Sequence, residues 1–100
     1  MVAYGFFAEI EAKEGKEDEV EAFLKEAKTL VDAEPGTIAW FAFPIGPRKY
    51  RIFDAFDSEQ GREEHLEGKV KAAIVARAEE LFTDFPTVTP VNLLAAKLPN

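Results

Sequence analysis

The residues best suited to chemistry lie in one stretch, Ile52–Lys69, which contains the only histidine of the chain. Asp54 has Ile52 and Phe56 two residues away on either side, so in a strand its carboxylate shares a sheet face with large apolar groups. His65 follows on a predicted helix. A carboxylate and an imidazole beside an apolar surface can serve as a base and its orienting partner. The stretch therefore predicts one wall of a pocket.

The helix that carries the histidine has an unusual stripe of small residues. Gly61, His65 and Gly68 are spaced i, i+4 and i+7, so they lie on one face. A glycine inside a helix costs about 0.5–1 kcal/mol relative to alanine, so Gly61 indicates close approach of another group. Asp57 or Ser58 is expected to cap the helix through a side-chain oxygen. An imidazole has a pKa near 6.5, which suits a general base, and carboxylates nearby would raise it.

Both candidate residues also have an ordinary structural interpretation. A lone histidine beside Glu63 and Glu64 is typical of a solvated helix face or a cap, at a partly exposed site that tolerates alanine. Asp54 can form a structural salt bridge, for which the candidate partners are Arg51, Arg62 and Arg77. At the level of the sequence the structural and the functional interpretations both stay open.

Length and charge set the class of protein. The 100 residues fit one domain, 1–100, and the formal net charge of −7 argues against nucleic acid as a partner. The absence of cysteine excludes disulfides and thiolate sites, and a single histidine makes a metal site a poor interpretation. No apolar run is long enough for a membrane span, and the N-terminus lacks signal-peptide features. We therefore expect a cytoplasmic protein with no membrane partner.

The hydrophobic pattern predicts the element order β-α-β-β-α-β. Four segments have strand-like patterns: 2–12, 37–45, 49–57 and 87–97. Two segments repeat apolar residues at helical spacing: 16–34 and 69–83. The short helix with the histidine lies between the third strand and the second long helix. Pro90 predicts that the last strand is at an edge or has a bulge. This order is that of a ferredoxin-like α+β fold with an antiparallel sheet.

Apolar side chains are predicted on both faces of that sheet. Phe7 points away from the main apolar face of its strand, and both faces of segment 37–45 are apolar. Helices from one chain cover only one face, and large apolar surfaces are usually buried by another molecule. We therefore expect a homodimer packed through the open sheet face. Strand parity leaves open whether Trp40 faces the pocket or the dimer interface.

Several motifs, taken in order, resemble the antibiotic-biosynthesis monooxygenase (ABM) domain, including its small quinol monooxygenases. Residues 7–17, FAEIEAKEGKE, resemble the first strand of the family and the entry to its first helix. Residues 33–40, AEPGTIAW, resemble its "A-E-P-G" helix end, with Trp40 where a tyrosine is usual. Residues 54–59, DAFDSE, lie where the family has a glutamate-arginine-tryptophan strand end followed by an acid and a serine. The spacing from there to His65 also fits.

The resemblance implies a dimeric α+β barrel with a pocket between the sheet and the helices of each subunit. It also implies oxidation of a small aromatic substrate, a quinol or polycyclic phenol, by molecular oxygen without flavin, haem or metal. In that chemistry His65 is the proton acceptor and Asp54 is its orienting partner or a second base. The expected substrate contacts are Trp40, Phe53, Phe56, Gly61 and Arg62.

Two features refine this expectation. Asp54 and Phe56 replace the glutamate and tryptophan of the family, and residues 73–76, AIVA, lack the histidine that binds iron in haem-degrading relatives. We therefore expect no haem and no other cofactor. A second function class fits the same pocket, because the fold hosts several activities: a dimeric barrel that binds or isomerises a small apolar or aromatic molecule without oxygen chemistry.

Overall fold

The computed structural model describes residues 2–99. In chain order its elements are β1 (Tyr4–Glu11), α1 (Glu17–Asp32), β2 (Thr37–Gly46), β3 (Lys49–Phe56), α2 (Glu59–Leu66), α3 (Lys69–Leu81) and β4 (Thr87–Asn92). The order confirms the predicted ferredoxin-like α+β fold, in which α2 and α3 together form the second helical unit. None of the helices within residues 2–99 combines the length and the apolar character that crossing a bilayer requires.

The strands form one antiparallel sheet in the order β2-β3-β1-β4. This order places β4 at an edge, as Pro90 predicts. The expected last strand, 87–97, is too long. β4 ends at Asn92 because Asn92 pairs with Tyr4, the first residue of β1, so the neighbouring strand extends no further.

Strand alternation gives the sheet two different faces. Phe6 on β1 lies opposite Asp54 on β3, and both side chains are buried on the face toward the helices. Phe7 and Phe53, the next opposed pair, point the other way and are half-buried. Trp40 on β2 lies opposite Asp54, so it belongs to the helix-facing side.

The core fills the space between the sheet and the helices. Helix α1 repeats apolar residues at helical spacing, and its buried side chains are Val20, Phe23, Leu24, Ala27 and Val31. Val20, Phe23 and Leu24 pack in one cluster with strand residues, with the last residue of α3 and with the residue after it: Ile10, Tyr50, Ile52, Leu81 and Phe82. The first turn of α1 is acidic, which suits the positive end of the helix dipole.

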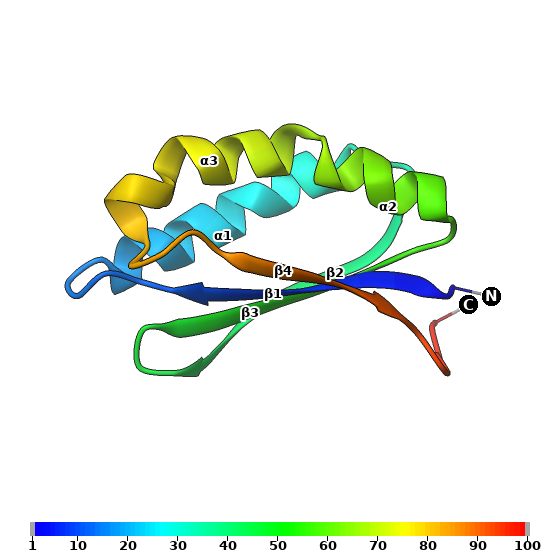
Figure 1. The fold of residues 1–100 in the computed structure, drawn as a ribbon, viewed down its shortest axis with the longest axis horizontal. Coiled ribbons are helices and arrows are strands. Elements are labelled where there is room, and N and C mark those ends of the chain that lie inside the picture. Colours follow the sequence, from blue (N-terminus) through cyan, green and yellow to red (C-terminus); the bar gives the residue numbers. More distant parts are fainter. Residues whose placement is uncertain (1, 100) are drawn as a thin grey trace.

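The opposite side of the sheet is rich in aromatic residues. Figure 1 shows α1, α2 and α3 together on one side of the sheet. On the other side, Phe41 is 57% and Phe43 is 38% exposed. We call this surface the open sheet face and define it by Phe7, Phe41, Phe43, Phe53 and Val91. Apolar side chains therefore lie on both faces, as predicted.

Two glycines hold α2 against the turn that leads into β2. A Cβ added to Gly36 in that turn would lie 3.1 Å from the Cα of Gly61 in α2, so the two backbones pack directly on each other. Ser58 caps α2, because its hydroxyl accepts a hydrogen bond from the backbone N–H of Gly61 at 3.0 Å. This contact brings α2 beside Glu34, which precedes the turn.

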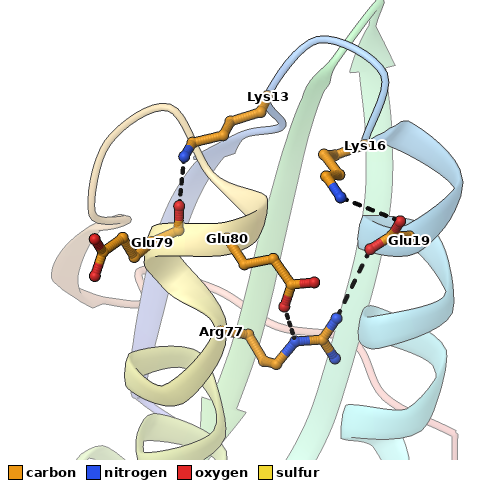
Figure 2. A network of polar contacts seen from close by, with 6 residues as sticks. All are labelled: Lys13, Lys16, Glu19, Arg77, Glu79 and Glu80. Atoms are coloured by element: carbon orange, nitrogen blue, oxygen red, sulfur yellow. Dashed lines mark hydrogen bonds and ion pairs between the residues drawn. The ribbon is translucent and has the colours of Figure 1, made fainter.

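Polar contacts fix the C-terminal half of α3 to the start of α1 (Figure 2). The Nη2 atom of Arg77 lies 3.9 Å from Glu19 on α1, and its Nε donates to Glu80 at 2.8 Å. Lys13, just before α1, donates to the backbone carbonyl of Glu79. Exposed pairs of this kind each contribute little. Together they tie α3, which forms one wall of the candidate site, to the rest of the fold.

Candidate active site

A pocket of about 220 Å³ lies between the sheet and the helices α2 and α3. The sheet contributes Phe6, Trp40 and Ile52 to its walls, and the helices contribute Leu66, Val70 and Ile74. Asp54 and His65 also line it. A concave, mostly apolar surface with a few convergent polar groups is typical of a small-molecule site.

Three side chains form a line beside this pocket. The Nε2 atom of His65 lies 3.1 Å from Oδ2 of Asp54, and its Nδ1 lies 2.5 Å from Oε1 of Glu34. The other oxygen of Asp54 accepts a hydrogen bond from the backbone N–H of Phe6 at 3.2 Å. The hydroxyl of Thr37 donates to Oε1 of Glu34 at 2.8 Å. Both nitrogens of the imidazole therefore face a carboxylate.

The side chains of Glu34, His65 and Asp54 are largely enclosed by the protein. The side chain of Asp54 is 3% exposed, that of His65 is 10% and that of Glu34 is 21%. The imidazole packs against Phe56 and Phe6, with ring centroids at 5.2 and 6.4 Å. Burial acts to lower the pKa of His65, but hydrogen bonds and charges from Asp54 and Glu34 outweigh it and raise the pKa above 6.5. The site thus favours an imidazolium that donates both N–H groups.

Separate elements position these groups. Glu34 lies after α1, Asp54 belongs to β3, and Phe6 lies beside it on β1. His65 is in the last turn of α2, where the negative end of the helix dipole also favours a cation. The arrangement therefore depends on the packing of α2 on the sheet and on the turn before β2.

The structure brings three of the predicted site residues together. His65, Asp54 and Trp40 all line the pocket, which answers the question that strand parity left open for Trp40. His65 is more enclosed than the partly exposed position expected from the sequence. Asp54 pairs with His65 rather than with one of the candidate arginines. The three arginines contact other groups. Arg51 lies near Glu9, and Arg62 donates to the backbone carbonyl of Val91. Arg77 contacts Glu19 and Glu80.

The other predicted contacts lie away from the pocket surface. Phe56 is fully buried and supports the imidazole from behind. Gly61 packs on the turn before β2, and Arg62 lies over the ring of Tyr4, 5.3 Å from its centroid. The sequence predicts Phe53 as one of the pocket walls, but Phe53 does not line the pocket. Adjacent strand residues point to opposite faces, so Phe53 belongs to the open sheet face.

Glu34 is the residue that the sequence interpretation missed. In the sequence, Glu34 reads only as part of a helix end before Pro35 and Gly36. It lies far from His65 along the chain, and only the packing of α2 on the turn brings them together. Its one signal in the sequence is its place in the A-E-P-G segment, and that segment resembles the helix end of the ABM family rather than a site.

Comparison with solved structures gives close matches over the whole fold. A protein of unknown function from Nitrosomonas europaea is 45% identical, with a TM-score of 0.97, over 100% of this chain and 97% of that chain. A protein from Mycobacterium tuberculosis is 19% identical, with a TM-score of 0.82, over 94% and 97%. A proposed antibiotic biosynthesis monooxygenase from Chloroflexus aurantiacus is 20% identical, with a TM-score of 0.72, over 95% and 96%. The last two similarities show the fold alone.

The family comparison is more specific. No curated protein matches the chain significantly. The sequence pattern of the family described as antibiotic biosynthesis monooxygenase (ABM) matches residues 4–77, from the start of β1 into α3. The matched range covers well over half of the chain and includes Glu34, Asp54 and His65. The chain therefore belongs to the antibiotic biosynthesis monooxygenase family.

Proposed function

We propose that the protein is a cofactor-independent monooxygenase that oxidises a quinol or another phenol with molecular oxygen. One observation supports this most directly. The paired Asp54 and His65, 3.1 Å apart, lie in the wall of an otherwise mostly apolar pocket. Oxidation of a phenol by oxygen requires a base, a donor to the phenolate oxygen and an aromatic cavity that excludes water. Membership of the ABM family is consistent with this chemistry.

The overall reaction needs only the two substrates. A phenol with a free ring C–H reacts with O₂ to give a quinone and water, so one oxygen atom enters the ring and the other leaves as water. Loss of the phenolic proton starts the reaction, because the electron-rich phenolate can give an electron to O₂. Recombination of the phenoxyl radical and superoxide at the ring carbon then gives a peroxide anion, which takes back the proton lost from the phenol and becomes a hydroperoxide. Loss of water, which takes the hydrogen from that ring carbon, yields the quinone.

The contacts of His65 suggest roles that differ from those expected from the sequence. Both ring nitrogens face carboxylates, and the pKa of His65 is raised by Asp54 and Glu34 against the effect of burial. A protonated imidazole cannot accept a proton. In our proposal Asp54 therefore takes the phenolic proton, and the positive charge of the His65 imidazolium beside it stabilises the phenolate.

The test is oxygen consumption by metal-stripped protein with a panel of quinols, naphthols and anthrone-like phenols. We expect uptake above the autoxidation background, and a loss of about 100-fold or more in Asp54→Asn, because general-base catalysis contributes about 10²–10⁴-fold. Glu63→Gln is the matched control, since it removes one exposed carboxylate from α2 and should keep full activity. Circular dichroism shows whether each variant is folded.

Two results would contradict the proposal. Equal rates of oxygen uptake in wild type and Asp54→Asn would show that the Asp54–His65 pair takes no part in the reaction. No uptake with any substrate, from folded protein, would favour the second function class, a barrel that binds or isomerises an aromatic molecule. Isomerisation needs the same proton-transfer pair and apolar walls but no oxygen, so ligand binding without uptake separates the two.

We also propose that two copies pair through the open sheet face. Phe41 and Phe43 are well exposed there, and Phe7, Phe53 and Val91 are half-buried around them. A contiguous aromatic surface of this kind is usually covered by a partner. A second copy of the chain presents the same self-complementary surface, as two-fold pairing requires.

A further inference from the structure

The ionisable groups of the pocket lie at two places. Among the described residues that line it, the titratable or charged side chains are Asp54, His65 and Lys71. Asp54 and His65 form the pair already described. Lys71 comes from the first turn of α3, and it is the one cation in this lining apart from His65.

Exposure orders these groups from the inside of the pocket to its mouth. The side chains of Asp54 and His65 are 3% and 10% exposed, whereas that of Lys71 is 49% exposed. Phe85 and Val88, which line the same pocket, are also well exposed. The buried pair therefore marks the inner end of the pocket, and Lys71 lies at its rim between α3 and the segment that leads into β4.

Lys71 is available to a ligand. Its Nζ lies 3.8 Å from Oε1 of Glu67, one helical turn away, and the side chain of Glu67 is 74% exposed. An exposed pair of this length contributes little, so the ammonium group can turn toward the pocket at low cost. The N-terminus of α3 adds positive potential at the same place.

The volume of the pocket limits the size of its ligand. A cavity of about 150 Å³ is known to hold one benzene ring. The pocket here measures about 220 Å³, and it opens toward solvent at the Lys71 rim. It therefore has room for one or two fused rings inside, with a polar substituent at the mouth.

We propose that the substrate is an aromatic hydroxy acid of one or two rings, whose hydroxyl group meets Asp54 and His65 and whose carboxylate pairs with Lys71. The proposal rests on the proposed function, because it takes this pocket to be the substrate site. Lys71 then determines specificity, since its ammonium group favours the binding of ligands that have a negative charge at the far end of the ring system. The strongly acidic surface of the chain makes this local cation the main source of attraction for an anion.

Binding can be measured with two matched probes, 6-hydroxy-2-naphthoate and 2-naphthol, which share the hydroxyl group and differ in the carboxylate. Calorimetry gives the affinities. The chain has a single tryptophan, so the one indole N–H resonance reports Trp40 in the pocket wall. We expect both probes to shift this resonance and the naphthoate to bind more tightly.

Variants at Lys71 test the role of the charge. Lys71→Gln should weaken naphthoate binding about fivefold, the upper end for a solvent-exposed ion pair, and should leave naphthol binding unchanged. Lys71→Arg should retain naphthoate binding. Lys69→Gln is the matched control, because Lys69 lies in the same turn of α3 but does not line the pocket. The loss should shrink as salt is added.

Three outcomes overturn the proposal: equal naphthoate affinity in wild type and Lys71→Gln, equal losses for both probes, or no effect of either probe on the Trp40 resonance. A different result would contradict the proposed oxygenase activity. Tight binding that depends on Lys71, without oxygen uptake from either probe, would contradict the oxygenase and leave the substrate class standing.

Discussion

His65 lies between two carboxylates that differ in their surroundings. Asp54 is nearly inaccessible and lines the pocket, whereas Glu34 is partly exposed and lies on the far side of the ring. An imidazolium between two carboxylates leaves the line with one net negative charge. Asp54 and Glu34 both raise the pKa of His65, and Glu34 does so from outside the lining of the pocket.

This arrangement predicts the effect of Glu34→Gln. The variant removes one of the two carboxylates that raise the pKa of His65. That pKa should therefore fall toward or below 6.5, because burial lowers it and only Asp54 then raises it. The chain has one histidine, so an NMR titration of its ring signals assigns the pKa directly.

The matched control for that titration is Glu64→Gln. Glu64 precedes His65 on α2, but its side chain is exposed and lies near Gln60, 3.3 Å from its amide nitrogen. This variant should leave the pKa of His65 almost unchanged. Equal pKa values in wild type and Glu34→Gln would show that the short contact between Glu34 and His65 does not exist in solution.

At the residue scale, the sequence predicted the part of the site that lies in one segment. Asp54 and His65 were found because a buried-face carboxylate and a lone histidine lie close along the chain. Glu34 could not be found in this way, since only tertiary packing brings it to the ring. The error at Phe53 was avoidable, because the same alternation that grouped Ile52 and Phe56 with Asp54 excludes it.

Helix α2 carries His65 but has little apolar surface to hold it in place. Gly61 is its one buried residue within the described chain, and it lies against Gly36. The position of His65 thus depends on two glycines that pack backbone on backbone. The sequence showed that Gly61 needed a neighbour but could not identify Gly36 as that neighbour.

The contact predicts that Gly36→Ala is destabilising. The added methyl group would lie 3.1 Å from the Cα of Gly61, and backbone atoms can yield only if α2 moves. Overpacking of this kind costs about 1–3 kcal/mol in the free energy of unfolding, measurable by urea denaturation. The displacement should also change the pKa of His65.

Gly46→Ala is the control for that measurement. A Cβ at Gly46, at the end of β2, would meet no atom within 4 Å, so its effect should stay within about 0.5 kcal/mol. If Gly36→Ala were as stable as Gly46→Ala, the close packing of α2 on the turn would be wrong. Periodicity predicted the strands and the two long helices, but a contact between a helix and a turn does not produce a periodic pattern in the sequence.

The molecule as a whole has apolar groups on both sides of one sheet. The helix-facing side contains the core and the pocket, and the open sheet face contains Phe7, Phe41, Phe43, Phe53 and Val91. The sequence predicted this two-sided pattern, because segment 37–45 is apolar on both faces. It could not identify which face Trp40 belongs to until the register with β3 was known.

Sedimentation tests the proposed pairing. We expect a dimer at micromolar concentration and a monomer for Phe41→Asp, which places a charge at the most exposed aromatic position of the open sheet face. Val75→Asp on α3 is the matched control, since Val75 is 53% exposed but lies on the helix side. Dissociation by both variants, or a wild-type monomer, would argue against this surface as the interface.

The two-sided sheet also bears on how the strands find their correct pairing. A slip of one residue between β1 and β3 normally exposes a hydrophobic set and is strongly disfavoured. Around the Phe7–Phe53 pair both faces are apolar, so hydrophobicity alone discriminates weakly between registers at that end of the strands, whereas Glu9 and Arg51 make the other end of the open side charged. Asp54 restores the discrimination, because its carboxylate finds the N–H of Phe6 and the ring of His65 only on the helix-facing side. The same carboxylate to which we assign the phenolic proton therefore also favours the native register over misfolded pairings.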